Sequence, residues 1–280
     1  MELKLAFCSI ACPDWTLAQI TENSRSMGFD GVQLCVHKDG SHIHPDMSVG
    51  EARKVGEQFR GAGVAIAGLW AFTSFMHSDD AELAKNQAQM RTLIAQAEAM
   101  GALSIRTYGG HIPAGANRDA MDQKMANALK PLAREAHERG VKIGLYTHDE
   151  WVSGKRNHQM IELVGSPGLG TVYDVSAAHA RSGESWEVTY QQIKDHLCYT
   201  LLSDRYVGPD EKPHFVSLGS GEVPLREMVK GLKSGGYGSH LSYIWEKKWM
   251  RNLADPEEML PHYVYWIRRE WKAADVKSGK

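Results

Sequence analysis

The sequence has little cysteine and no long hydrophobic run. Its four cysteines, Cys8, Cys12, Cys35 and Cys198, are dispersed over 280 residues without a CxxC pair. This excludes the spacing of a disulfide scaffold or of a structural zinc site. No apolar run approaches the roughly 20 residues of a transmembrane helix, and residues 1–9 lack a signal-peptide pattern. We therefore expect a cytoplasmic protein that does not contact a membrane.

An excess of charge of one sign is also missing. The chain has 34 acidic and 32 basic residues and a formal net charge of -2, so it lacks the basic surplus typical of proteins that bind nucleic acid or anionic membranes. No linker rich in proline or serine divides it. With 42% hydrophobic residues the chain can bury a full core, and we predict a single domain over residues 1–280.

Short segments rich in Leu, Val, Ile and aromatic residues recur along the chain and predict strands. They are Leu3–Cys8, Gly31–Val36, Val64–Trp70, Ser104–Tyr108, Val141–Thr147, Gly170–Val175, Cys198–Ser203 and His240–Trp245. Helical periodicity lies between them, in Thr16–Met27, Asp80–Met100, Ala120–Arg139 and Pro256–Trp271. This alternation predicts an α/β protein with a single (β/α)8 TIM barrel. A Rossmann sheet is disfavoured, because no GxGxxG follows the first strand.

In such a barrel the chemistry lies where the strands end. Side chains alternate between the two faces of a strand, so taking Asp174 as inward-facing predicts which neighbours line the pocket. These are Gln33, Cys35, His37, Tyr146, His148, Ser176, Tyr199, Leu201, Ser203, Ile244 and Glu246. Aromatic residues at strand ends predict walls for a planar ligand, and they are Trp70, Phe72, Tyr108, Tyr146, Tyr173 and Tyr199.

Several short motifs carry a resemblance to a known family. They are GFDGV at 28–32, RTYGG at 106–110, THDEW at 147–151, GSGEVPL at 219–225 and WEKKW at 245–249. They resemble the sugar phosphate isomerase/epimerase family of xylose isomerase-like TIM barrels along nearly the whole chain. The resemblance implies sugar isomerisation or epimerisation, frequent self-association into homo-oligomers, and a Mn- or Mg-like ion held by Glu, Asp, His and Glu on strands five to eight.

The sequence departs from that pattern at the ligands. Tyr146, Leu201 and Ile244 stand where the resemblance implies Glu, His and Glu, and only Asp174 keeps a ligating side chain. One carboxylate cannot hold a catalytic metal, so we predict neither a metal nor a cofactor here. The replacements predict a drier pocket for a flatter, less polar ligand. Because the changes concentrate at these motifs, they favour a redesigned pocket over drift after duplication.

Cys35, where the resemblance implies Arg, is the strongest candidate nucleophile. A thiol at a barrel mouth becomes nucleophilic when a nearby His stabilises its thiolate, and His148, His37 and His179 are the candidate partners. The alternative is that Cys35 is a small buried hydrophobic residue.

Other side chains offer weaker alternatives. Ser203 and Ser176 could act as nucleophiles, although no GxSxG elbow supports them. Asp174 could act as a general base if apolar neighbours raise its pKa. Lys247 and Lys248 belong to a scaffold motif and are expected to be solvated charges.

Three function classes remain for a protein that binds a small molecule. The first is a metal-independent hydrolase of activated esters, with Cys35, His148, Asp174 or Ser203 as catalytic candidates. The second is a sugar phosphate isomerase or epimerase with an atypical site. The third is a binder without catalysis. From sequence we favour the hydrolase.

Overall fold

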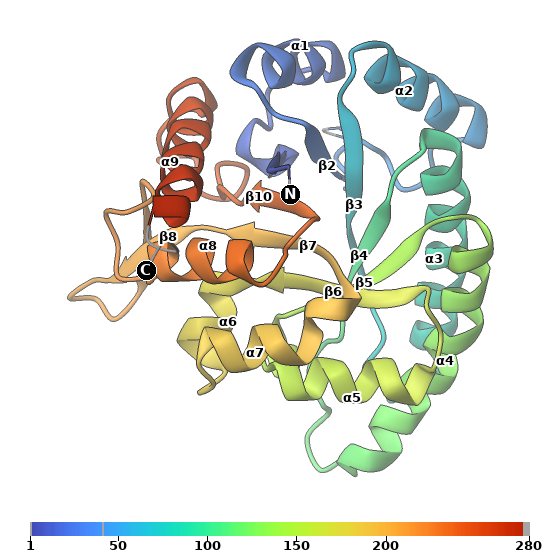
Figure 1. Ribbon diagram of the computed structural model, residues 1–280. Helices are drawn as coiled ribbons and strands as arrows, with labels where there is room; N and C mark the ends of the chain where they lie inside the picture. Colours follow the sequence, from blue (N-terminus) through green and yellow to red (C-terminus); the bar gives the residue numbers. More distant parts are fainter. Residues whose placement is uncertain (1, 41, 277–280) are drawn as a thin grey trace.

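A closed barrel of eight parallel strands forms the centre of the computed structural model, which describes residues 2–40 and 42–276 (Figure 1). Around the barrel the strands follow the order β1-β10-β7-β6-β5-β4-β3-β2. Their bounds are β1 Lys4–Cys8, β2 Gly31–Cys35, β3 Ala65–Ser74, β4 Ser104–Tyr108, β5 Lys142–Tyr146, β6 Leu169–Asp174, β7 Leu197–Leu202 and β10 His240–Tyr243. The predicted barrel is confirmed. Residues 1, 41 and 277–280 of the predicted domain lie outside the described residues.

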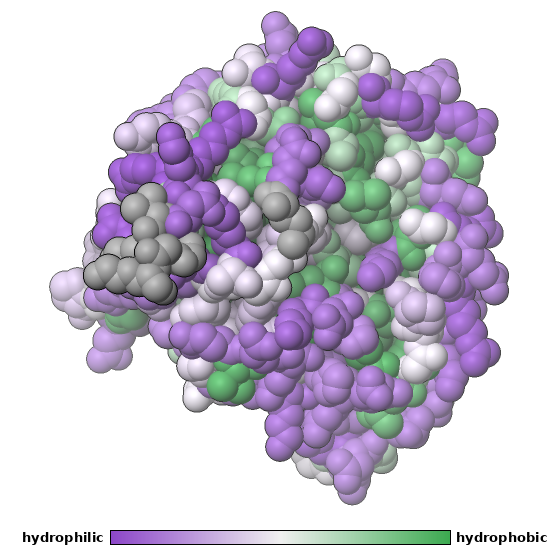
Figure 2. Space-filling view, in the orientation of Figure 1, coloured by the Kyte–Doolittle hydropathy of each residue, from purple (hydrophilic) through white to green (hydrophobic). Residues whose placement is uncertain are grey.

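Helices cover the outside of the barrel. They are α1 Leu17–Met27, α2 Val49–Gly61, α3 Asp80–Met100, α4 Arg118–Glu138, α5 Gly154–Val164, α6 Val175–Arg181, α7 Trp186–Ile193, α8 Leu225–Ser234 and α9 Pro256–Val276, with short 3-10 turns η1 Ser9–Ala11, η2 Asp149–Trp151 and η3 Lys194–His196. Figure 2 shows mainly hydrophilic residues over the outer helices, with hydrophobic residues between them. None of the described helices combines the length and the apolar character that crossing a bilayer requires.

Local sequence sets the helix ends. Thr16 and Ser48 each begin a helix with a capping box. The cap hydroxyl accepts a hydrogen bond from the backbone N–H of the third helical residue, and the side chain of that residue accepts one from the backbone N–H of the cap. Gly28 ends α1 in the left-handed conformation at φ 82°, which a residue without a Cβ adopts at little cost. These signals explain why the predicted start and end of α1 agree with the structure to within one residue.

Two separate hydrophobic clusters show which face of each strand points inward. The barrel interior holds Tyr146, Val172 and Leu201, among others, whereas Tyr173 and Leu202 belong to the cluster beneath the helices. The predicted alternation is therefore confirmed for strands five to seven. The prediction for Tyr173 as a pocket wall is wrong, because its hydroxyl reaches outward to the Trp186 carbonyl at 3.3 Å.

A hairpin after β7 was not predicted. Strands β8 Asp204–Val207 and β9 Pro213–Val216 pair antiparallel. The carboxylate of Asp204 accepts backbone hydrogen bonds from Gly219 at 2.7 Å and Gly221 at 3.0 Å. It thereby holds the GSGEVPL loop against the hairpin.

Candidate functional site

A buried arginine lies at the centre of the candidate site. Arg106 on β4 has no exposed surface, and its guanidinium carbon lies 3.9 Å from the Trp70 ring centre and 4.3 Å from that of Tyr108. It donates to the Ala71 carbonyl at 2.7 Å and to the Tyr108 hydroxyl at 3.0 Å. Aromatic faces attract a cation, so the cage keeps a positive charge fixed beneath the mouth.

Arg106 was not predicted as a site residue, because the RTYGG segment was used only as a motif of the family resemblance. The signal was present, since strand alternation places Arg106 and Tyr108 on the same face. With Tyr108 predicted to point inward, Arg106 had to point inward as well.

Most of the predicted aromatic residues come together. The ring centres of Trp70 and Tyr146 are 5.7 Å apart, those of Tyr108 and Tyr146 are 5.6 Å apart, and that of Phe72 lies 6.3 Å from Tyr108. Phe72 is 38% exposed at the rim. Tyr199 lies deeper in the barrel, where its ring approaches Gly68, and it is not part of this wall.

Asp174 is held by two hydrogen bonds. The Tyr146 hydroxyl donates to one carboxylate oxygen at 2.9 Å, and the Ala177 backbone donates to the other at 2.9 Å. The second bond caps helix α6. Burial and the Asp174 charge raise the pKa of Tyr146, so Tyr146 stays a protonated donor.

Glu246 provides a second carboxylate, just after β10. Burial raises its pKa from 4.5 to about 7, with the Arg106 charge opposing that rise and the Asp174 charge adding to it. A carboxyl group with this pKa exchanges a proton near neutral pH, as general acid–base catalysis requires.

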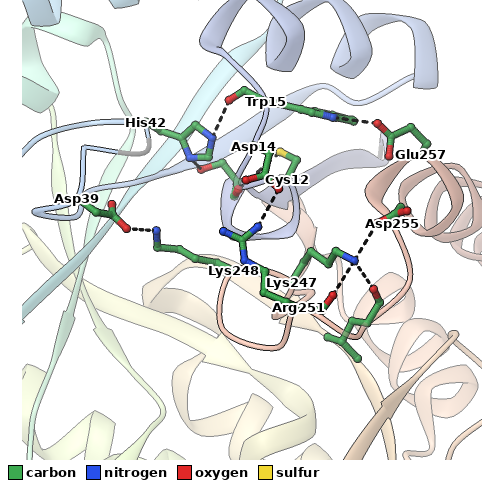
Figure 3. Close-up of polar contacts among 12 residues, drawn as sticks. Cys12, Asp14, Trp15, Asp39, His42, Lys247, Lys248, Arg251, Asp255 and Glu257 are labelled. Atoms are coloured by element: carbon green, nitrogen blue, oxygen red, sulfur yellow. Dashed lines mark hydrogen bonds and ion pairs between the residues drawn. The ribbon is translucent and has the colours of Figure 1, made fainter.

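The segment after β10 is fixed by ionic contacts on both sides (Figure 3). Lys248 pairs with Asp39, while Lys247 reaches Asp255 at 2.8 Å. The Lys248 backbone also donates to the Ile10 carbonyl at 2.9 Å. The expectation of a solvated Lys248 is wrong, because its side chain is only 5% exposed. These contacts restrain the neighbouring Glu246.

The three candidate histidines lie in different surroundings. His148 stacks on Tyr146 at 5.2 Å between ring centres and lies 2.7 Å from Asp149, and burial lowers its pKa. His37 packs edge-on against Phe72 at 5.5 Å. His179 is exposed on α6. His148 and His37 therefore belong to the rim, whereas His179 points to solvent.

The Cys35 thiol lies in the apolar barrel interior. Burial raises its pKa to about 11, although the charges of Lys248 and Arg106 oppose that rise. Among the hydrogen bonds of residues 2–40 and 42–276, none joins this thiol to His148, His37 or His179. At neutral pH the thiol is therefore protonated, which does not favour the predicted nucleophile.

The remaining candidate residues make hydrogen bonds or packing contacts within the barrel. Ser176 exchanges hydrogen bonds with the backbone of Ser203, which ties α6 to the end of β7. Gln33 is fully buried and accepts from Ser242. Leu201 and Ile244 pack within the interior cluster.

The donor set at the mouth does not fit the cation site that the resemblance implies. Tyr146, Leu201 and Ile244 occupy three of the four strand ends, and both oxygens of Asp174 already accept hydrogen bonds. In the described part of the chain, no three His, Cys, Asp or Glu side chains at the mouth bring ligand atoms within 4.8 Å of one another. We derive no chemical step through a metal here.

Fold and site define a (β/α)8 barrel with a small polar cluster at its mouth. The family model described as "Xylose isomerase-like TIM barrel" matches residues 22–270, and the chain belongs to this family. No curated protein matches the sequence significantly.

Solved structures share the fold at low identity. L-ribulose 3-epimerase superposes with a TM-score of 0.80 at 18% identity, covering 99% of this chain and 97% of the other. The probable 3-DHS dehydratase AsbF of Bacillus anthracis gives a TM-score of 0.77 at 15% identity, covering 95% of this chain and 99% of the other. The 3-keto-D-glucoside 4-epimerase YcjR of E. coli gives a TM-score of 0.77 at 13% identity, covering 96% of this chain and 100% of the other. These matches do not bear on a redesigned pocket, which stays a prediction.

Proposed function

We propose that this protein is a metal-independent isomerase or epimerase of a small sugar-like hydroxycarbonyl compound. The observation that carries the proposal is the grouping of Glu246, Asp174 and the Arg106–Tyr108 pair at one end of the barrel. Each of these four groups influences the pKa of Tyr146, which lies among them. Family membership and the epimerases with the same fold support the same class of reaction.

The reaction begins with removal of a proton from the carbon beside a carbonyl group. The Glu246 carboxylate accepts the proton, and the electron pair of the broken C–H bond moves onto the carbonyl oxygen to give an enolate. Glu246 then releases its proton to solvent, and a proton from solvent adds to the opposite face of the same carbon to give the epimer. For an α-hydroxycarbonyl compound, proton transfer between the oxygens and protonation at the neighbouring carbon give the isomer.

Arg106 and Tyr108 supply stabilisation for the enolate oxygen. Because the Tyr108 oxygen accepts a hydrogen bond from Arg106, its own hydrogen remains to be donated to a substrate oxygen. A fixed cation and a positioned donor in a site with little water stabilise developing negative charge strongly. In this proposal Arg106 is a positioning residue that acts through Tyr108.

The hydrolase interpretation has less support. It needs a thiolate at Cys35, and burial raises the pKa of that thiol to about 11. It also needs a His base in contact with the thiol, and the described hydrogen bonds contain none. Of the two serine candidates, Ser176 uses its hydroxyl in hydrogen bonds with the backbone of Ser203.

Binding without catalysis is the second candidate function. The replacement of strand-end polar groups by Leu201 and Ile244, both buried, favours a ligand with an apolar face. A protein of this kind would bind sugars or aromatic compounds without converting them.

A substrate panel tests the proposal. The purified protein, treated with a chelator, is incubated with L-ribulose, D-psicose, D-tagatose and 3-keto-glucosides, and products are identified by NMR. We expect one class of these compounds to be converted and Glu246→Gln to lose most of the activity. Binding with no conversion of any compound would favour the binder instead.

Self-association of the barrel stays a prediction.

A further inference from the structure

Three side chains that commonly bind metals meet on the outside of the barrel. They are His158 and Glu162 on α5 and His196 in η3. One ring nitrogen of each histidine and one carboxylate oxygen all lie within 4.8 Å of one another. Nothing in the proposed reaction uses them.

The fold explains why these residues meet. Positions four apart on a helix lie one above the other on the same face, so His158 and Glu162 point the same way from α5. Helix α5 packs beside α7, and η3 continues from the end of α7 (Figure 1). His196 immediately precedes β7, so the cluster lies at the amino end of the strand, away from the mouth.

His158 also has an unsatisfied polar atom. Its Nδ1 is shielded from solvent, and within the described chain it has no hydrogen-bond partner. Its ring centre lies 6.0 Å from that of His196, with the ring planes 50° apart. A buried ring nitrogen without a partner is unfavourable. A cation bound to the lone pair of this nitrogen would give it a partner.

We propose that His158, Glu162 and His196 bind a divalent transition-metal ion of the zinc class. Two imidazoles and one carboxylate form a ligand set that zinc accepts, with water in the fourth position. Zinc bonds of about 2.0–2.2 Å in a tetrahedron place ligand atoms roughly 3.3–3.5 Å apart. In the structure the ligand atoms lie within 4.8 Å of one another, so a bound ion would draw them closer together.

His158 and Glu162 also border a groove of about 560 Å³ between α4 and α5. The protein ligands join α5 to the turn that leads into β7. An ion that binds this arrangement only in the folded chain stabilises it, and the site is separate from the mouth of the barrel.

Equilibrium binding of Zn²⁺ to untagged protein tests the site. We expect one ion per chain in isothermal titration and a rise in Tm with zinc concentration. Because loss of an outer-shell partner weakens metal affinity about 10–100-fold, loss of a ligand in His196→Ala or Glu162→Gln should weaken it at least about 10-fold. Glu162 is exposed, so Glu162→Gln tests the site even if His196→Ala does not fold.

Two controls locate the ion. His137→Ala removes an exposed histidine of α4, and Asp174→Asn changes the mouth. Both should keep wild-type zinc affinity. The proposal is overturned if the wild-type protein binds no zinc, if Glu162→Gln and His196→Ala bind as tightly as wild type, or if Asp174→Asn removes the ion.

Discussion

The Tyr146 hydroxyl donates a hydrogen bond of 2.9 Å to the Asp174 carboxylate across two neighbouring barrel strands. The resemblance implied metal ligands at both positions. Here the tyrosine satisfies the carboxylate directly, and this changes what the mouth can do. The Asp174 charge also adds to the rise in the pKa of Glu246.

Tyr146→Phe should lower the free energy of unfolding. The change removes a buried donor from a charged acceptor, and such bonds contribute about 1.5–3 kcal/mol. Tyr173→Phe is the matched control, because its hydroxyl donates to a neutral carbonyl at 3.3 Å and should cost about 0.5–1.5 kcal/mol. Urea denaturation measures both. A smaller loss for Tyr146→Phe than for Tyr173→Phe would contradict the account.

Ile244→Glu should destabilise the fold by about 1–3 kcal/mol near neutral pH. Ile244 is 3% exposed within the apolar interior cluster, where an added carboxylate loses its hydration. Ile244→Leu, which conserves volume, should cost less than about 1.5 kcal/mol. An unchanged or raised denaturation midpoint for Ile244→Glu would show that this position is not dry.

Glu246 should make stability fall as pH rises. Its pKa is raised in the folded state from 4.5 to about 7, so its contribution to stability is fully present below 4.5 and is lost between 4.5 and about 7. Each pH unit corresponds to about 1.36 kcal/mol, which limits the loss to about 3 kcal/mol. The unfolding free energy of Glu246→Gln minus that of wild type should therefore be larger at about pH 8 than at about pH 4. Denaturation experiments on both proteins across this range measure that difference. A difference that does not change with pH would contradict the pKa shift.

The fold could be predicted because its signals are local and periodic. Each strand and cap depends on residues close together in the sequence, as at Ser104–Tyr108, whose predicted and observed bounds agree. The hairpin β8–β9, with four residues in each strand, was missed because it does not belong to the strand–helix alternation from which the barrel was predicted.

The site was predictable only in part. Strand alternation placed Tyr146, Leu201 and Ile244 correctly in the interior, whereas it could not show that Asp39 reaches Lys248 from a distant loop. The burial that raises the pKa of Cys35 also depends on packing between strands, which no single segment reveals.

Cys35→Ala should retain isomerase or epimerase activity, because in our account Cys35 is a packing residue with no exposed surface. Iodoacetamide should modify it slowly in the folded protein and readily after unfolding. Cys198→Ala is the matched control. An adduct on Cys35 that forms in a rapid burst with an activated aryl ester would restore the hydrolase interpretation.

Solvent deuterium incorporation tests the central claim most directly. The protein is incubated in D2O with a chelator and the ketose that it converts fastest, and mass spectrometry with NMR locates deuterium in substrate and product. The account predicts deuterium at the carbon beside the carbonyl, at a rate that rises with pH to a plateau above an apparent pKa near 7. It also predicts a loss of about 10²–10⁴-fold in Glu246→Gln. No incorporation with any ketose, an unchanged rate in Glu246→Gln, or loss of exchange in the presence of the chelator would contradict it.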